Sequence, residues 1–216
     1  MGKLKVLCLH GYRQNETIFR ERSGALRKLI KKHIDFVFIT APHVIPEEAN
    51  LARAEPEQER GWWFSKPNRS YNAMDSTDTC IGFEESLKLV QEIFESQGPF
   101  DGVLGFSQGA AFVSLLCVLQ NDPSNKIEFK FAILIAGFRS LVSPHQHMYR
   151  DPIDCPSFHT IGSTDGVIPT QSSEELLNMF ASGTAYRHSG GHYVPASPQL
   201  RTAITEFLTP FIISEQ

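Results

Sequence analysis

Hydrophobic residues along the chain fall into two alternating patterns. Short, nearly continuous apolar runs have the length of buried strands and occupy residues 5–9, 34–39, 102–104, 129–136, 157–161 and 185–188. Longer stretches with apolar residues at helical spacing, or apolar on nearly all sides, lie between and after these runs, at residues 15–32, 77–97, 110–119, 169–180 and 197–211. Strands that alternate with helices indicate right-handed crossovers between parallel strands. The pattern therefore predicts an α/β fold with a six-stranded, mainly parallel sheet flanked by helices.

Capping residues support several of these helix ends. Asn15 is a good N-cap for the first helix, and Gly98 followed by Pro99 stops the second. Ser197 as N-cap and Pro198 at the first helical position predict the start of the last helix.

Two stretches, residues 41–76 and 138–156, show neither period. Both are longer than ordinary connections between elements, so we expect functional excursions and not linkers. We expect them to lie over the edge of the sheet where the parallel strands end, in a single α/β domain that spans residues 1–216.

Composition supports one domain with a large core. The chain has 216 residues, of which 41% are hydrophobic and 16 are phenylalanines, enough for a substantial interior. The net charge of −4 is mild, and the cations within residues 20–32 gather on one early helix, as a solvated face does. Nucleic acid is therefore not expected as a partner.

The N-terminal residues, the lengths of the apolar runs and the cysteines indicate a cytoplasmic protein. Residues 1–5 run straight into a strand, too short for a signal-peptide core, and no later apolar run reaches the length of a membrane span. We therefore expect no integral membrane association. The four cysteines lie far apart without a C-x-x-C pair, which favours reduced thiols at Cys8, Cys80, Cys117 and Cys155.

Residues 105–109 read Gly-Phe-Ser-Gln-Gly and join the third strand to the helix at 110–119. A serine between a strand and a helix, with glycines two residues away on both sides, is the nucleophile-elbow pattern G-x-S-x-G. The serine occupies a strained turn, and the strand and helix cross so closely that a Cβ at either glycine would clash. Ser107 is the candidate nucleophile.

A serine that transfers acyl groups needs a base on its hydroxyl, an acid that holds the base in one tautomer, and N–H donors for the oxyanion. Ser107 follows the third strand, Asp165 the fifth and His192 the sixth. In a parallel sheet these loops open at one edge. The chain order Ser, Asp, His is that of α/β-hydrolases. The sequence therefore predicts a catalytic triad of Ser107, Asp165 and His192.

Other residues could take the acid and base roles. Asp151 and Asp154 precede the fifth strand, at the opposite edge, and His188 lies in or at the end of the sixth. A turn role for Ser107 and a capping role for Asp165 also remain open. His10 follows the first strand, and we expect a structural hydrogen-bonding role for it. No histidine shows metal-ligand spacing that points to a site, so no metal is expected.

Five large side chains are candidates for a substrate pocket. Trp62, Trp63 and Phe64 follow the second strand, and Met148 and Tyr149 lie in the stretch after the fourth. An apolar wall on the active edge would favour esters with an alkyl or acyl chain. The alternative interpretation is that the tryptophans anchor a long loop against the core.

Several blocks together resemble the FSH family of serine hydrolases: residues 10–15 (HGYRQN), 61–64 (GWWF), 98–111, 165–169 and 189–192. The resemblance covers essentially the whole chain. It implies a compact α/β-hydrolase without a large lid domain, related to acyl-protein thioesterases and carboxylesterases, with no metal or organic cofactor. It also carries the triad onto Ser107, Asp165 and His192, and the oxyanion hole onto the backbone N–H groups of Tyr12 and Gln108.

These observations predict a serine hydrolase that cleaves small-molecule carboxylic esters with an apolar chain through an acyl-serine intermediate. Two alternatives use the same fold. One is a thioesterase or protein deacylase with the same triad, and the other is a non-catalytic ligand-binding module.

Overall fold

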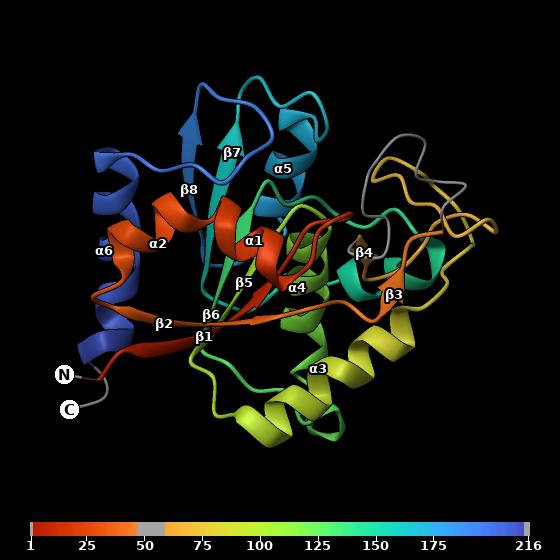
Figure 1. Cartoon of the computed structure of the whole chain (residues 1–216), viewed down its shortest axis with the longest axis horizontal. Helices are drawn as coiled ribbons and strands as arrows, with labels where there is room; N and C mark the ends of the chain where they lie inside the picture. The colour runs from red at the N-terminus through yellow and green to blue at the C-terminus, as the bar shows by residue number, and fades with distance from the viewer. Residues whose placement is uncertain (1, 47–58, 214–216) are drawn as a thin grey trace.

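A computed structural model describes residues 2–46 and 59–213 of the chain (Figure 1). Residues 47–58, part of the excursion predicted at 41–76, lie outside the described residues. The strands are β1 (Leu4–Leu9), β2 (Ile34–Ile39), β3 (His43–Val44), β4 (Arg60–Gly61), β5 (Gly102–Phe106), β6 (Phe131–Ile135), β7 (Ser157–Gly162) and β8 (Gly183–His188). The helices are α1 (Glu16–Arg22), α2 (Gly24–Ile30), α3 (Phe83–Gln97), α4 (Gln108–Leu119), α5 (Thr170–Leu177) and α6 (Pro198–Ile213), with short 3-10 helices η3 (Pro123–Asn125) and η4 (Ser143–Tyr149).

Six of the strands form one parallel sheet in the order β2-β1-β5-β6-β7-β8, which confirms the predicted fold class. The first strand β1 lies between β2 and β5, so the loop after β1 begins next to Ser107 at the end of β5. The remaining two strands, β3 and β4, form a separate antiparallel pair that the sequence did not indicate.

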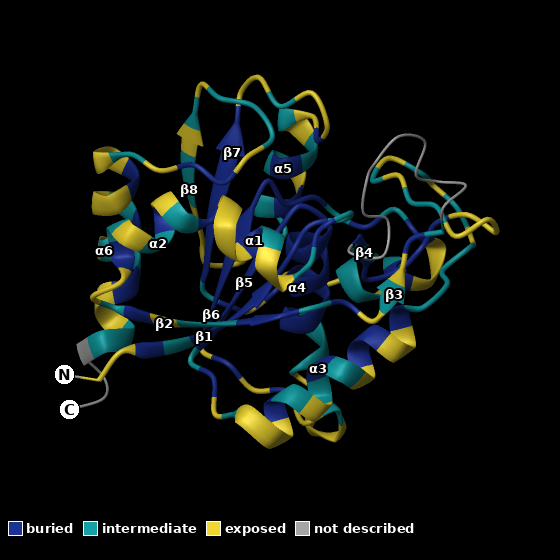
Figure 2. Ribbon diagram, viewed as in Figure 1, coloured by how far each residue is buried: buried dark blue, intermediate teal, exposed yellow. Residues whose placement is uncertain are grey.

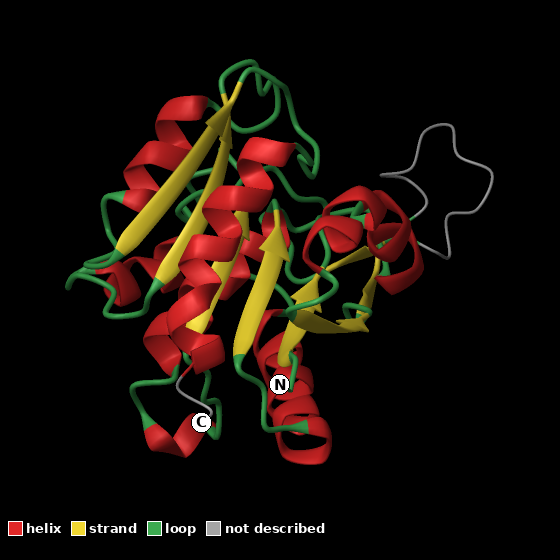
Figure 3. Ribbon diagram, turned by 90° about the vertical axis from the view of Figure 1, so that its left-hand side faces the viewer, coloured by secondary structure: helices red, strands yellow, loops and turns green. Residues whose placement is uncertain are grey.

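Helices cover both faces of the sheet (Figure 3). Along β1, alternate side chains point to opposite faces, as the period of a strand requires. Leu4, Val6 and Cys8 belong to the core that includes side chains of α1, α2 and α6. Leu7 and Leu9 belong to the core that includes side chains of α3, α4 and α5. Figure 2 shows the consequence: the central strands β1, β5, β6 and β7 are buried, the edge strand β8 is partly exposed, and exposed residues gather on the outer sides of the helices.

The single helix predicted at 15–32 is broken into α1 and α2. Asn15 caps α1 as expected, its Oδ1 accepting from the N–H of Ile18 at 2.9 Å. At Ser23 the backbone leaves the helical region (φ −86°, ψ 2°), and the hydroxyl donates to the carbonyl of Phe19 at 2.7 Å. A serine hydroxyl that bonds back to the preceding turn competes with helix continuation.

The helix predicted from residue 77 starts only at Phe83. Gly82 precedes it with a φ of 91°, a conformation that glycine adopts without strain. Ile81 and Phe64 exchange two backbone hydrogen bonds of 2.9 and 3.1 Å, so residue 81 belongs to an extended pairing. Thr77 makes a similar bridge to Val142. These two bridges connect residues just before α3 to both predicted excursions.

Three buried histidines should make the protein unstable in acid. Burial lowers the pKa of His10 to about 4, of His145 to about 4 and of His159 to about 3. All three are neutral in the folded state at pH values where the unfolded chain, with a usual pKa of 6.5, takes up protons. The free energy of unfolding should therefore keep its full value above pH 6.5 and fall as the pH is lowered toward 4. The loss approaches about 1.4 kcal/mol per pH unit for each histidine.

The measurement is the free energy of urea unfolding at pH values from 7.5 to about 4.5. His159→Gln removes one titrating ring while keeping a donor for the Ser157 hydroxyl, which His159 Nε2 meets at 3.0 Å. In this variant the slope of the unfolding free energy against pH should be smaller by roughly the contribution of one histidine. An unchanged slope in this variant would contradict the assignment.

No helix within the described ranges is both long and apolar enough to span a membrane.

Candidate active site

Ser107 lies at a sharp turn between β5 and α4. Its backbone is strained, with φ 53° and ψ −117°. A Cβ on Gly105 would lie 2.4 Å from the carbonyl oxygen of Gly109, and a Cβ on Gly109 would lie 2.3 Å from that of Leu9. Neither contact is possible between real atoms, so the two glycines allow β1, β5 and α4 to pack closely enough to present the serine.

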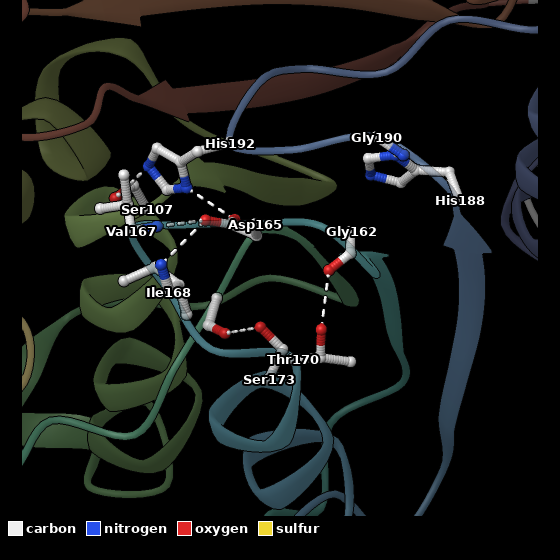
Figure 4. A network of polar contacts seen from close by, with 11 residues as sticks. Ser107, Gly162, Asp165, Val167, Ile168, Thr170, Ser173, His188, Gly190 and His192 are labelled. Carbon is white, nitrogen blue, oxygen red and sulfur yellow. Dashed lines mark hydrogen bonds and ion pairs between the residues drawn. The ribbon is translucent and has the colours of Figure 1, made fainter.

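Ser107, His192 and Asp165 form one hydrogen-bonded chain (Figure 4). Ser107 Oγ lies 3.0 Å from His192 Nε2, and His192 Nδ1 lies 2.8 Å from Asp165 Oδ2. Asp165 Oδ1 accepts from the backbone N–H groups of Val167 and Ile168, each at 2.8 Å. The carboxylate, only 3% exposed, thus fixes a proton on Nδ1 and leaves Nε2 free to accept the serine proton.

The rival residues lie elsewhere. His188 Nδ1 accepts from the N–H of Gly190 at 3.2 Å, and Figure 4 shows its ring well away from Ser107. Asp151 and Asp154 are exposed and precede β7, so they lie at the other end of that strand from Asp165. Among the described residues there is no cluster of three or more His, Cys, Asp or Glu that could hold a metal ion.

Two backbone N–H groups next to Ser107 are available to a ligand. Gln108 is the first residue of α4, and Tyr12 follows the glycine after His10. Neither N–H donates to an acceptor in the described part of the chain, although Gln108 is fully buried. Because buried N–H groups are nearly always paired, an unpaired one at a helix N-terminus favours a bound oxyanion.

The side chain of Gln108 and the indole of Trp62 hold the two loops that carry these N–H groups. Gln108 Oε1 accepts from the N–H of Trp62 at 3.0 Å, and Gln108 Nε2 donates to the carbonyl of Trp63 at 2.8 Å. Trp62 Nε1 donates to the carbonyl of His10 at 2.7 Å, and Ser86 Oγ donates to the carbonyl of Trp62 at 2.5 Å. The tryptophan therefore links the loop after β1 to the start of α4.

His10 is a structural residue in this network. Its Nε2 accepts from the N–H of Ala41 at 2.9 Å, so the ring proton is on Nδ1 and donates to the carbonyl of Gly11 at 2.8 Å. The buried, neutral ring fixes the loop that leads to Tyr12.

The pocket beside Ser107 is not the one expected from the large apolar residues. Trp62, Trp63 and Phe64 are 0% exposed and pack in the core, as the alternative interpretation of the tryptophans proposed. Tyr149 is half-buried and its hydroxyl lies 2.9 Å from that of Ser114, and Met148 lines a separate cavity beside His145. None of the five borders the pocket at Ser107, because a large side chain in a long loop has more to gain from burial than from forming an open wall.

The pocket itself has a volume of about 440 Å³. Gly11, Tyr12, Gln14, Arg22, Lys66, Tyr71, Asn72, Ala73, Phe106, Ser107, Val167 and His192 line it. Sequence reasoning missed most of these residues. The site residues expected from the sequence include only Tyr12, Ser107 and His192 of this lining. Two signals could have found others: Lys66, Tyr71, Asn72 and Ala73 belong to the excursion at 41–76, and Val167 lies two residues after Asp165.

Trp62→Phe should lower kcat more than it changes KM. The variant keeps an aromatic ring but removes the donor to the His10 carbonyl, and the freed loop would displace the Tyr12 N–H. We expect a fall in kcat of about tenfold or more, since small misplacements near the reacting atoms have large effects, and a loss of about 1–3 kcal/mol in the free energy of unfolding. Steady-state kinetics and urea unfolding measure both.

Trp63→Phe is the matched control. Trp63 is equally buried, but its Nε1 has no hydrogen-bond partner among the described residues. The substitution removes a similar volume without breaking a bond. Equal kcat values for the two variants would show that the indole–carbonyl bond does not position the loop.

Known proteins resemble this chain along nearly its whole length. A family model described as serine hydrolase (FSH1) matches residues 1–204. The chain is 46% identical to "Esterase OVCA2" of Xenopus tropicalis over 215 residues, covering 97% of this chain and 94% of that one. It is 43% identical to "Esterase CG5412" of Drosophila melanogaster over 205 residues, covering 95% and 73%.

Solved structures share the fold at low identity. Acyl-protein thioesterase 2 of Zea mays superposes with a TM-score of 0.69 at 18% identity, over 98% of this chain and 95% of that one. Esterase PE8 gives a TM-score of 0.64 at 18% identity, over 97% and 93%. At this identity the likeness establishes the α/β-hydrolase architecture alone.

Proposed function

The chain belongs to the FSH1 serine hydrolase family, and we propose that it is a carboxylesterase-type enzyme that hydrolyses esters through an acyl intermediate on Ser107. One observation carries the proposal. The Ser107–His192–Asp165 chain has bonding distances of 3.0 and 2.8 Å and stands beside two N–H groups that have no acceptor among the described residues. A non-catalytic binding module would have no need of both features together. The names of its relatives, which are esterases, support an ester as the substrate.

In the acylation step, Ser107 Oγ attacks the ester carbonyl carbon while His192 Nε2 takes the hydroxyl proton. The carbonyl oxygen becomes an oxyanion, which the N–H groups of Tyr12 and Gln108 stabilise. Asp165, held by its two backbone donors, stabilises the imidazolium that forms. Collapse of the tetrahedral intermediate breaks the ester C–O bond, and His192 gives its proton to the leaving alcohol.

In the deacylation step, a water molecule takes the place of the alcohol. His192 removes a proton from the water as its oxygen attacks the acyl carbon, and the same two N–H groups hold the second oxyanion. Breaking the acyl–oxygen bond returns the proton to Ser107 Oγ and releases the carboxylic acid. His192 acts as base and acid in turn, which requires the fixed Nδ1 proton that Asp165 supplies.

We propose that the substrate is a small ester with an apolar chain or ring next to its carbonyl. The support comes from the apolar part of the pocket wall, formed by Tyr12, Tyr71, Ala73, Phe106 and Val167. These replace the tryptophans expected from the sequence. A volume of about 440 Å³ is in the range of small-molecule sites.

A fluorophosphonate probe tests the proposed function, because it forms a stable bond only with an activated serine. The wild-type chain should be labelled and Ser107→Ala should not. Ser163→Ala is the control, since Ser163 is an exposed serine two residues before Asp165 with no part in the mechanism. Absence of labelling in the wild type, or labelling that survives in Ser107→Ala, would overturn the proposal.

We also propose that the enzyme works in the cytoplasm. The support is that all four cysteines are free thiols, three of them buried, as suits a reducing compartment. Fractionation of cells that express the tagged full chain tests this location, and recovery in an organelle or secreted fraction would contradict it.

A further inference from the structure

The pocket beside Ser107 is positively charged in a protein whose net charge is −4. Arg22 and Lys66 line it, and no aspartate or glutamate does so in the described part of the chain. Asp165 lies behind His192 and is only 3% exposed. The excess of cations is therefore local to the pocket and opposite in sign to the charge of the whole molecule.

Arg22 carries a charge that no described carboxylate compensates. It is the last residue of α1, exposed, and makes no ion pair with any residue that the structure describes. Lys66 differs, because its Nζ lies 3.6 Å from Asp75 Oδ2. An exposed lysine–carboxylate pair at that distance is weak, so Lys66 keeps much of its attraction for a ligand. Arg22 is the stronger candidate for a ligand contact.

The neutral polar groups of the pocket also offer donors and few acceptors. The Asn72 amide oxygen accepts from the N–H of Met74 at 3.0 Å, which leaves its nitrogen as the free group. The Gln14 amide oxygen is occupied by the N–H of Gly11 at 3.4 Å. With Arg22 and Lys66, the wall is suited to a ligand rich in oxygen acceptors, and an anion satisfies such donors best.

We propose that the preferred substrate carries a second, anionic group, a carboxylate or phosphate, which Arg22 binds and Lys66 assists. This inference rests on the proposed function and specifies its substrate class. The apolar residues of the wall then contact the part of the molecule between the ester and the anion. An arginine suits this role, since its planar guanidinium forms two parallel hydrogen bonds with a carboxylate or phosphate.

The test compares two para-nitrophenyl esters of equal chain length, the hexanoate and the half-ester of hexanedioic acid. They differ only in a terminal carboxylate. The quantity measured is the ratio of kcat/KM for the charged ester to that for the neutral ester. The wild type should prefer the charged ester, and Arg22→Gln should lower the ratio about fivefold to tenfold, as expected for a charge-assisted bond that is partly exposed to water. Arg22→Lys should restore part of it.

Lys28→Gln is the matched control. It removes the same charge from an exposed position on the neighbouring helix α2, outside the pocket. Its ratio should equal that of the wild type, which separates a local contact from the effect of net charge. A second pair, a monoacylglycerol and the same molecule with a phosphate on its glycerol, shows whether the anion belongs to the acyl or the alcohol side. The proposal is supported if the wild type prefers the charged member of either pair and this preference is reduced in Arg22→Gln.

The outcomes separate the two proposals. The wild type could hydrolyse the neutral esters through Ser107 but show the same kcat/KM ratios as Arg22→Gln for both pairs. That result would overturn the proposal of an anionic substrate and leave the proposed esterase activity in place. A wild type that hydrolyses none of the esters and takes no fluorophosphonate label would overturn the esterase and, with it, this inference.

Discussion

Replacing Ser107 with alanine should lower kcat about a million-fold, the scale found when the nucleophile is removed from another serine hydrolase. The fall is large because the acyl-enzyme route disappears entirely and His192 is left without the hydroxyl that it activates. The N–H groups of Tyr12 and Gln108 remain, so a small rate above the uncatalysed reaction should persist.

The fold should survive this substitution. Alanine keeps the Cβ that already occupies the strained turn at φ 53°, and the serine N–H still donates to the carbonyl of Ile135 at 2.9 Å. Thermal unfolding should therefore differ little from that of the wild type. A correctly folded Ser107→Ala that retains more than about one hundredth of the wild-type kcat would be incompatible with a serine nucleophile.

The close approach of Ser107, Asp165 and His192 could be anticipated from the sequence because it follows from topology. Parallel strands place every strand-to-helix loop at one sheet edge, so the order of the strands was enough to bring the three loops together. The elbow could be anticipated as well, because Gly105 and Gly109 report a close backbone crossing that only glycine permits. Such features depend on local sequence and on rules shared by all parallel sheets.

The interruptions of the helices were harder to anticipate. Ser23 is a buried serine whose hydroxyl bonds back to Phe19, and nothing in the apolar spacing of the sequence signals that bond. The residues before Gly82 have helical spacing, but Ile81 pairs with Phe64, seventeen positions earlier in the chain. Pairing over such a separation is a tertiary effect that local propensity does not contain.

The pocket was missed for a related reason. Apolar composition alone cannot distinguish a tryptophan that forms an open wall from one that anchors a loop, and Trp62 and Trp63 are anchors. The actual wall gathers Arg22, Lys66, Tyr71 and Val167 from separate parts of the chain. Arg22 belongs to a set of cations that read as a solvated face, and only the folded structure shows one of them beside the serine.

Asp165→Asn should lower kcat about ten-thousand-fold with little change in the fold, as the corresponding substitution does in serine proteases. Asp165 Oδ1 accepts from the N–H groups of Val167 and Ile168. An asparagine would keep these bonds only with its amide oxygen in that position. Its NH2 group would then face His192 Nδ1, which must accept a hydrogen bond and therefore lose its proton.

The ring proton would move to Nε2, which faces Ser107 Oγ at 3.0 Å. A protonated Nε2 cannot take the serine proton, so the base is present but in the wrong tautomer. Asp165→Ala is the informative comparison. The alanine variant, unlike the asparagine variant, loses the bonds to Val167 and Ile168, but it imposes no tautomer on His192. It should therefore be less stable than Asp165→Asn and yet no less active. If instead the asparagine variant kept a kcat within about tenfold of the wild type, the carboxylate would serve only to cap its loop, and the base would have to be oriented by another group.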